Sequence, residues 1–286
     1  MSVTLPKLPE RALLADLCRE AAARERLQPQ LIEKDFYLTR LLWALGQVFG
    51  DELLLKGGTL LSKVDLGFLR MSEDADLVLP GTPSTGRLAN VRRMHRVRDA
   101  LKEIGSVVGL VARLPAGELF EKAAHGLWQL DYASEFGPQG IKVEVTIRPL
   151  LRPAREVVLR QLLVDPLAGD ASGAKCFALD VAEVRAEKVR AAFTREAVRD
   201  LYDLDQLLAA GVDLSSPAFI KLVDAKLAEL RAAPLAQQGK SFALDKGRRR
   251  AVEAGLARDL PGVLREGAPA FDLDKMLARF DRMWRK

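Results

Sequence analysis

The sequence predicts an α/β fold: an N-terminal domain with a mixed sheet, residues 1–170, followed by a mostly helical domain, residues 171–286. Two observations carry this prediction. As far as Val164, short apolar or alternating runs typical of strands are interspersed with segments of helical periodicity. From about Asp180 the apolar residues recur at helical spacing almost without interruption. A chain of 286 residues is long enough for two such domains.

The N-terminal domain begins with elements that alternate between helix and strand. In order, the pattern predicts two helices within residues 10–49, a buried strand at 52–58, a helix at 59–68, a strand at 74–80 and a basic helix at 86–104. The first two helices are separated near Pro29, because proline interrupts a helix interior. Pro80 ends its strand, since proline cannot donate to a sheet ladder.

Four further strands are expected before the helical domain. They are predicted at residues 106–114, 125–133, 140–149 and 156–164. The segment GIKVEVTIRP alternates most regularly, with Val143 and Val145 on one face and Glu144 at the centre of the other. This strand is therefore expected to bury one face and to present polar side chains on the opposite face.

Composition excludes several classes of protein. No apolar run approaches the ~18 residues that a membrane helix needs, and the N-terminus lacks the layout of a signal peptide, so we expect a cytoplasmic protein without a membrane partner. Cys18 and Cys176 have no metal-binding or redox spacing and are expected to be reduced and buried. His95 and His125 are the only histidines, and neither is assigned a role. Catalysis would therefore depend on carboxylates, lysines and backbone groups.

The net charge of +5 is concentrated at the C-terminus. Residues 240–286 hold twelve Lys/Arg and seven Asp/Glu, whereas residues 1–239 hold 32 of each kind. The consecutive Arg248, Arg249 and Arg250 indicate a polyanionic partner, and a solvated basic helix face is the alternative. With an RNA partner, this segment and the basic helix at 86–104 would form two walls of one phosphate-binding track.

A Gly-Gly-Thr turn and an Asp-x-Asp strand form the main candidate site. Gly57 and Gly58 open a helix, where backbone N–H groups and the helix dipole favour a phosphate. Asp74 and Asp76 are two residues apart on one strand and point to the same face, so they can share a metal ion. Oxygen ligands of this kind suit Mg²⁺, with Mn²⁺ as the alternative. The combination predicts a site for a nucleoside triphosphate (NTP) and a metal ion.

Five further side chains are candidates for the site or its regulation. Thr59, Ser62 and Lys63 are expected to contact the β- and γ-phosphates, although hydroxyls near a helix start are more commonly capping groups. Glu144 is the candidate third metal ligand, and a solvated glutamate on a half-buried strand is the alternative. Ser72 precedes Asp74 by two residues, so a phosphate there would add negative charge beside the metal site.

The segment KGGTLLSKVDLGFLRMSEDADL resembles the first two motifs of the AbiEii/AbiGii-type nucleotidyltransferase toxins, which belong to the DNA polymerase β-like superfamily. EKVRAAFTREAVRDLYDL resembles the two downstream motifs, an essential lysine and an Arg-Asp-x-x-Asp helix. The matching positions are Lys188, Arg199, Asp200 and Asp203. The resemblance covers residues 30–210 and implies a nucleotidyltransferase-like fold, a separate antitoxin protein and nucleotide transfer to the 3′ end of tRNA. The spacing between Lys188 and Asp200 is shorter than the family's, so either aspartate is a candidate for the family's role.

The second cluster also has an interpretation from its residues alone. If residues 181–211 formed one helix, Lys188, Arg195 and Arg199 would lie along one cationic face able to meet a triphosphate. Asp200 and Asp203 would then hold Lys188 or Arg199 in place by ion pairing. A solvated helix with ordinary ion pairs is the alternative.

Three hypotheses of function follow. The first is a Mg²⁺-dependent nucleotidyltransferase toxin that transfers nucleotides from an NTP to an RNA acceptor, foremost the tRNA 3′ end, and so blocks translation; its helical domain would complete the site and carry a basic acceptor-binding surface. The second is the same enzyme acting on a protein or small molecule. The third is a non-catalytic module that binds RNA or a partner protein, and the intact glycine and aspartate motifs argue against it.

Overall fold

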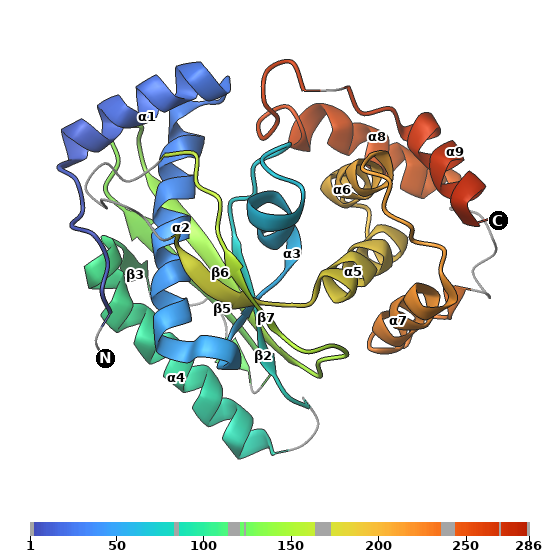
Figure 1. Ribbon diagram of the computed structural model, residues 1–286, viewed down its shortest axis with the longest axis horizontal. Helices are drawn as coiled ribbons and strands as arrows, with labels where there is room; N and C mark the ends of the chain where they lie inside the picture. Colours follow the sequence, from blue (N-terminus) through green and yellow to red (C-terminus); the bar gives the residue numbers. More distant parts are fainter. Residues whose placement is uncertain are drawn as a thin grey trace. The chain divides into compact units, whose positions relative to one another are not determined.

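The computed structural model describes residues 3–82, 86–113, 121–122, 124–163, 173–235, 244–268 and 270–284. The chain forms two compact units, Met1–Leu179 and Asp180–Lys286 (Figure 1). The domain boundary predicted between residues 170 and 171 lies in segment 164–172, outside the described residues.

The first unit is built on a mixed sheet, as predicted. Its described strands are β1 (Leu54–Leu55), β2 (Ala75–Pro80), β3 (Val111–Arg113), β4 (Glu121–Lys122), β5 (His125–Tyr132), β6 (Gln139–Arg148), β7 (Arg155–Val158) and β8 (Lys175–Ala178). Their order is β3-β5-β6-β2-β1-β8-β7, and β4 pairs with β5 beside this path. The pairs β2–β6 and β1–β8 are parallel, while the other pairs are antiparallel. The strand that carries Asp76 therefore lies directly beside the strand that carries Glu144, and Asp74 directly precedes β2.

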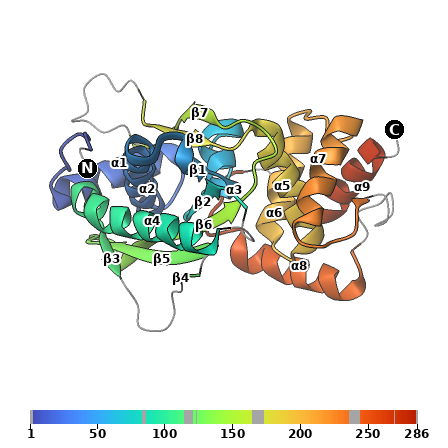
Figure 2. The same cartoon turned by 90° about the horizontal axis from the view of Figure 1, so that it is seen from below.

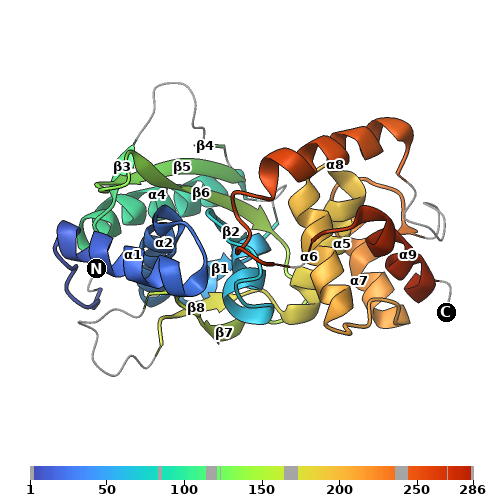
Figure 3. The same cartoon turned by 90° about the horizontal axis from the view of Figure 1, so that it is seen from above.

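Helices cover one face of this sheet. The helices of the first unit are α1 (Arg11–Glu25), α2 (Pro29–Phe49), the 3-10 helix Gly50–Glu52, α3 (Gly57–Leu60), the π-helix Leu61–Asp65 and α4 (Arg87–Val108). α1 packs on α2, and α2 and α4 lie against the same side of the sheet (Figures 2 and 3). Val143, Val145 and Ile147 of β6 point to that side and are buried, while Glu144 points to the opposite side. The sheet thus has an apolar face under the helices and a polar face.

The second unit is helical within its described residues. It contains α5 (Val181–Thr194), α6 (Val198–Ala209), α7 (Pro217–Ala228), α8 (Lys246–Asp259) and α9 (Leu273–Trp284). α5 packs on α6 and α7, and α6 packs on α8 and α9. The single helix expected over residues 181–211 is wrong, because Arg195 adopts an extended conformation (φ −125°, ψ 163°) and separates α5 from α6.

Other elements also differ from the sequence prediction. The strand expected at residues 156–164 ends at Val158, and β8 was not predicted. The strand expected at residues 106–114 is reduced to β3, because α4 continues to the buried Val108 and ends at Gly109, whose φ of +86° suits glycine. The helix expected at residues 59–68 begins earlier, at Gly57, and continues as a π-helix from Leu61.

The remaining expectations on composition can be compared with the structure directly. Cys18 and Cys176 are free and buried, as predicted, and burial raises the pKa of each thiol to about 12. Among the described helices, none combines the length and the apolar character that a membrane crossing requires.

A buried glutamate in α2 predicts a pH-dependent stability. Glu33 has no exposed surface, its carboxylate accepts a hydrogen bond from Ser134 Oγ at 2.5 Å, and burial raises its pKa above the usual value. A raised pKa in the folded state means that the unfolded chain ionises first, so stability falls as pH rises from the unfolded pKa to the folded one. We expect Glu33→Gln to gain thermal stability relative to the wild type as the pH rises above the unfolded pKa of a glutamate, about 4.3. Parallel melting-temperature profiles for the two proteins would contradict this assignment.

Candidate active site

The glycine turn is shaped by two side chains that lie against it. Gly57 has φ +70°, and a Cβ there would lie 2.5 Å from Oδ2 of Asp76. A Cβ on Gly58 would lie 2.6 Å from Nη2 of Arg70. Only glycine combines the left-handed backbone with this close approach. The turn therefore brings the Asp76 carboxylate directly to the start of α3.

Lys56 is a site residue that the sequence analysis missed. Its backbone N–H donates to the carbonyl of Asp76 at 2.9 Å, and its Nζ lies 4.0 Å from Oδ1 of Asp76. Its side chain is only 12% exposed. Among the described residues no side chain caps the start of α3, and the first N–H groups of a helix have no partner within the helix. An ammonium and open backbone amides thus lie beside one carboxylate. The signal in the sequence was the position of Lys56 directly before the glycines.

The two hydroxyls predicted to bind phosphate have partners inside the protein. Thr59 is fully buried and donates to the backbone carbonyl of Asp74 at 2.5 Å. Thr59 Oγ1 also lies 2.9 Å from Ser72 Oγ, and because a hydroxyl carries one proton, Ser72 donates in that pair. Ser62 is buried and donates to the carbonyl of Thr59 at 3.5 Å. In this arrangement Thr59 positions the start of β2.

Lys63 also lies inside the first unit. It has no exposed surface, and its Nζ contacts Asp35 Oδ1 at 2.5 Å and Thr39 Oγ1 at 2.6 Å. Oδ2 of Asp35 accepts a further hydrogen bond from the backbone N–H of Leu162 at 3.1 Å. The buried ion pair of Lys63 with Asp35 thus joins the π-helix to α2. The structure gives no support for a contact between Lys63 and phosphate.

The predicted carboxylates lie on the polar face of the sheet. Asp76 and Glu144 are register partners on the parallel strands β2 and β6, and Asp74 is two residues before Asp76. Burial raises the pKa of Asp74, Lys142 opposes this effect, and Asp76 adds to it. A bound cation would relieve both the burial of charge and the repulsion between the two aspartates.

Three ligands are not gathered into a ready-made metal site. In the part of the chain that the structure describes, no three His, Cys, Asp or Glu side chains are close enough together to hold a metal ion. Glu144 instead lies 3.7 Å from Nε2 of His125. Asp74 and Asp76 nevertheless fit Mg²⁺, which is commonly held by one or two carboxylates and completed by substrate phosphates and water.

The second unit contains a buried lysine between two aspartates. Nζ of Lys188 on α5 lies 2.7 Å from Asp200 Oδ1 and 2.8 Å from Asp203 Oδ2 on α6, and its side chain is 7% exposed. The prediction that these aspartates hold Lys188 by ion pairing is confirmed. Arg199 instead donates to the carbonyl of Asp259 at 3.2 Å. The predicted cationic face of Lys188, Arg195 and Arg199 on one helix is wrong, since α5 ends before Arg195.

Comparison with known proteins identifies the family. The sequence model described as "Nucleotidyl transferase AbiEii toxin, Type IV TA system" matches residues 40–285. The chain belongs to the AbiEii family. It is therefore a nucleotidyltransferase toxin of a toxin–antitoxin system, and enzymes of this kind use an NTP and a divalent metal ion. No curated protein matches the chain significantly.

Solved structures of other proteins have a fold similar to that of this AbiEii-family chain. MenT4, a nucleotidyltransferase toxin from Mycobacterium tuberculosis H37Rv, superposes with a TM-score of 0.63 at 22% identity, covering 97% of this chain and 89% of MenT4. JHP933 from Helicobacter pylori gives 0.54 at 16% identity, covering 91% of this chain and 92% of JHP933. At these identities the comparison concerns the fold alone.

The arginines of the basic C-terminus in this AbiEii-family chain have partners within the second unit. Arg248 donates to the carbonyls of Ala192 and, at 2.9 Å, Arg195 at the end of α5. Arg249 forms two hydrogen bonds to Asp274, at 2.8 and 2.9 Å, and one to Glu253. These two arginines therefore stabilise the helical unit, which weakens the interpretation of Arg248–Arg250 as a continuous RNA track.

The basic helix that was expected to line the RNA-binding surface lies on the other side of the sheet. The basic helix at 86–104 is α4, which packs against the apolar side of the sheet through buried residues such as Met94, Val97 and Leu101. The carboxylates point to the other side of the sheet. The prediction that this helix forms the near wall of the acceptor track is therefore wrong.

The packing of Gly57 gives a test of the turn. Gly57→Ala is expected to lower transfer by about 100-fold, because a shift of ~1 Å at a reacting group has an effect of this size. Gly211→Ala is the matched control: Gly211 has φ +75°, and no described atom lies within 4 Å of its ideal Cβ. Both variants carry the cost of about 1–2 kcal/mol for a left-handed alanine. Equal activities per folded molecule would show that the contact with Asp76 is unimportant.

Proposed function

We propose that this AbiEii-family protein is a Mg²⁺-dependent nucleotidyltransferase that transfers nucleotides from an NTP to RNA, foremost the 3′ end of tRNA, and thereby blocks translation. The observation that carries the proposal is the placement of Asp76 against the Gly57 turn and beside Lys56. Metal-binding carboxylates and phosphate-binding amides are the two components that nucleotide transfer from a triphosphate requires.

Each group of the site has a separate role in this proposal. Asp74 and Asp76 would hold the metal ion, which neutralises charge on the phosphates and activates the acceptor hydroxyl. The open amides at Gly57 and Gly58 and the ammonium of Lys56 would bind the phosphates of the NTP. Thr59 keeps the strand that bears the aspartates in place. Glu144 remains a candidate ligand that would have to turn from His125 toward the metal ion.

The role proposed for the second unit rests on the family motifs. Lys188 would neutralise charge on the triphosphate, with Asp200 and Asp203 fixing its ammonium. Arg199 is retained as a nucleotide-binding candidate from the same motif, although its guanidinium bonds to Asp259. A separate antitoxin protein is the proposed partner, as the family description implies.

A labelling experiment tests the function. Purified protein is incubated with each of the four NTPs, labelled at the α-phosphate, together with total RNA and total protein from a bacterial lysate. The proposal requires label in RNA of tRNA size, loss of transfer in EDTA and recovery on addition of Mg²⁺. Label only in protein or in small molecules would establish the same enzyme with another acceptor. Absence of turnover in both Mg²⁺ and Mn²⁺ would favour a non-catalytic binding module.

A further inference from the structure

The polar face of the sheet continues from the carboxylates toward strand β3. Arg113 of β3 is the register partner of Gln129 of β5, and Gln129 is the partner of Lys142 of β6. Lys142 and Asp74 directly precede the first β2–β6 pair, Ala75 with Val143, and so are neighbours on the same face. This row of four side chains crosses three strand spacings, about 14 Å in all.

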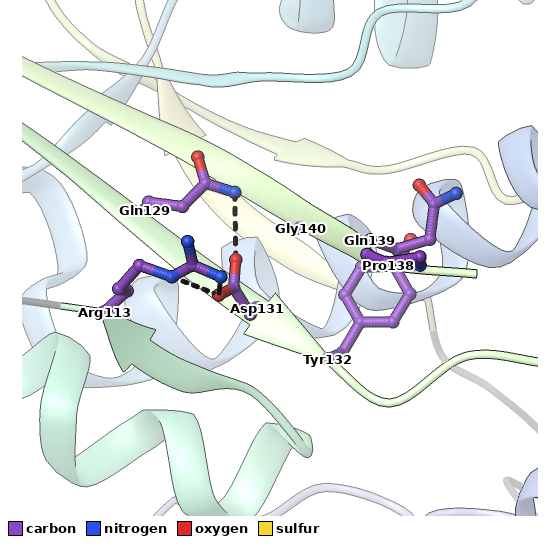
Figure 4. Close-up of a pocket in the computed structure, with 7 residues that line it drawn as sticks. All are labelled: Arg113, Gln129, Asp131, Tyr132, Pro138, Gln139 and Gly140. Atoms are coloured by element: carbon purple, nitrogen blue, oxygen red, sulfur yellow. Dashed lines mark hydrogen bonds and ion pairs between the residues drawn. The ribbon is translucent and has the colours of Figure 1, made fainter.

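The outer end of this row opens into a small pocket. It has a volume of about 290 Å³, and its polar lining comes from Arg113, Gln129, Asp131 and Gln139 (Figure 4). Arg113 Nε donates to Asp131 Oδ2 at 2.7 Å, and Gln129 Nε2 donates to Asp131 Oδ1 at 3.3 Å. Arg113, Gln129 and Asp131 are thus held in a defined arrangement by one another.

A glycine allows this arrangement. A Cβ on Gly140, which also lines the pocket, would lie 2.2 Å from Nε2 of Gln129 and 2.6 Å from Oδ1 of Asp131. Gly140 does not have a positive φ. A Cβ there would nevertheless lie 2.9 Å from the backbone oxygen of Leu130, so an alanine would also press on strand β5. The missing side chain at position 140 therefore makes room for the amide and the carboxylate to lie over β6.

The chemistry of the pocket suits the edge of a nucleobase. A guanidinium supplies only donors, a carboxylate only acceptors and an amide both, which matches the mixed donor and acceptor pattern of a base edge. The volume is at the lower limit of the 300–1,000 Å³ typical of ligand pockets, which is too small for a whole nucleotide triphosphate but adequate for one base. Proteins that recognise single-stranded RNA read unpaired bases through such contacts.

The position of the pocket favours the acceptor over the NTP. The phosphate-binding groups Lys56, Gly57 and Gly58 lie on the β1 side of Asp76, whereas the pocket lies on the β5 side of β6. The exposed ammonium of Lys142 lies between the pocket and Asp74, where it can contact a backbone phosphate. A single strand whose 3′ end is at the aspartates would therefore pass Lys142 before it reaches the pocket.

We propose that this pocket binds one unpaired base of a single-stranded RNA acceptor upstream of its 3′ end, and that Lys142 contacts the intervening backbone. The inference rests on the proposed function, because it assigns the RNA acceptor to the polar face of the sheet.

Direct binding of RNA, without catalysis, tests the inference. Fluorescence anisotropy of a short labelled single-stranded RNA in EDTA gives the Kd without transfer. Gln129→Leu and Gly140→Ala are expected to raise the Kd about tenfold, and Lys142→Gln is expected to lower the salt slope by about 0.7. The matched control is Arg92→Gln, which removes an exposed charge from α4 on the opposite side of the sheet. Its affinity is expected to stay within about twofold of the wild type, and thermal unfolding verifies that each variant is folded.

The outcomes separate this inference from the proposed function. If the wild type labels RNA while Gln129→Leu and Gly140→Ala bind RNA as tightly as it does, the pocket assignment is overturned and the function stands. If the wild type labels only protein and binds no RNA, both are overturned. Weaker binding by the pocket variants and by Arg92→Gln to the same degree would indicate a general charge effect and would also overturn the pocket assignment.

Discussion

Asp76→Asn is expected to abolish nucleotide transfer while the protein remains folded. Asp76 lies against the glycine turn and beside Lys56, so in the proposed site its carboxylate would join the metal ion to the amides that bind the phosphates. Removing one electrostatic element of this kind typically costs 10²–10³-fold in rate. Asp74→Asn is expected to have a similar effect on transfer. Retention of more than about a tenth of the activity, ~1.4 kcal/mol, would eliminate the metal assignment.

For Asp74→Asn, the expected effect on stability is opposite to the effect on activity. Burial raises the pKa of Asp74, so keeping it ionised at neutral pH costs folding free energy, and that cost is present above the unfolded pKa. Asp74→Asn should therefore unfold at the same or a higher temperature than the wild type at pH 8. Asp16→Asn provides the control, because Asp16 is 72% exposed in a surface ion pair with Arg19 and should affect neither quantity. If Asp74→Asn is both inactive and unfolded, a structural role of Asp74 would explain the loss of transfer.

The second large effect is expected at Lys188. Lys188→Ala would leave the buried carboxylates of Asp200 and Asp203 without their shared counterion, and breaking a buried ion pair in this way costs about 3–5 kcal/mol. That is a large part of the total stability of a domain, about 5–15 kcal/mol. We therefore expect loss of both transfer and folding stability, measured by labelling and by denaturant unfolding.

A second pair of variants separates the two roles of Lys188. Lys188→Met combined with Asp200→Asn and Asp203→Asn removes all three charges together and should recover much of the stability. Lys188→Arg keeps the charge but changes its geometry, so partial transfer is expected. If the lysine has a structural role only, the triple variant will transfer nucleotides at a rate close to that of the wild type. A folded but inactive triple variant together with a partly active Lys188→Arg would support a direct role.

The local geometry of the site was predictable because it depends on short periodicities. Asp74 and Asp76 share a face since side chains alternate along a strand, and the alternation of residues 140–149 placed Glu144 on a polar face of its own strand. That Asp76 and Glu144 lie side by side, by contrast, depends on the pairing of β2 with β6. A single sequence contains no direct record of that pairing.

The roles of the cations depend on distant partners and were harder to predict. Lys63 is paired with Asp35, 28 positions earlier, through the docking of α2, so its position after the glycine turn suggested a phosphate contact that the fold does not support. Arg195 ends α5 although the surrounding residues favour helix, and Arg248 donates to its carbonyl from 53 positions away. Side-chain direction in these cases follows from tertiary packing, which overrides local propensity.

The pairing of Lys63 with Asp35 has a consequence for how the protein can be shortened. The family match begins at residue 40, yet Asp35 precedes it and supplies the counterion for a lysine in the π-helix that follows the glycine turn. A fragment cut at the start of the family match would retain every motif residue but would remove Asp35 and Thr39, the two partners that α2 supplies to the Lys63 ammonium. The smallest independently folding unit of this enzyme is therefore expected to extend back at least to Asp35 in α2.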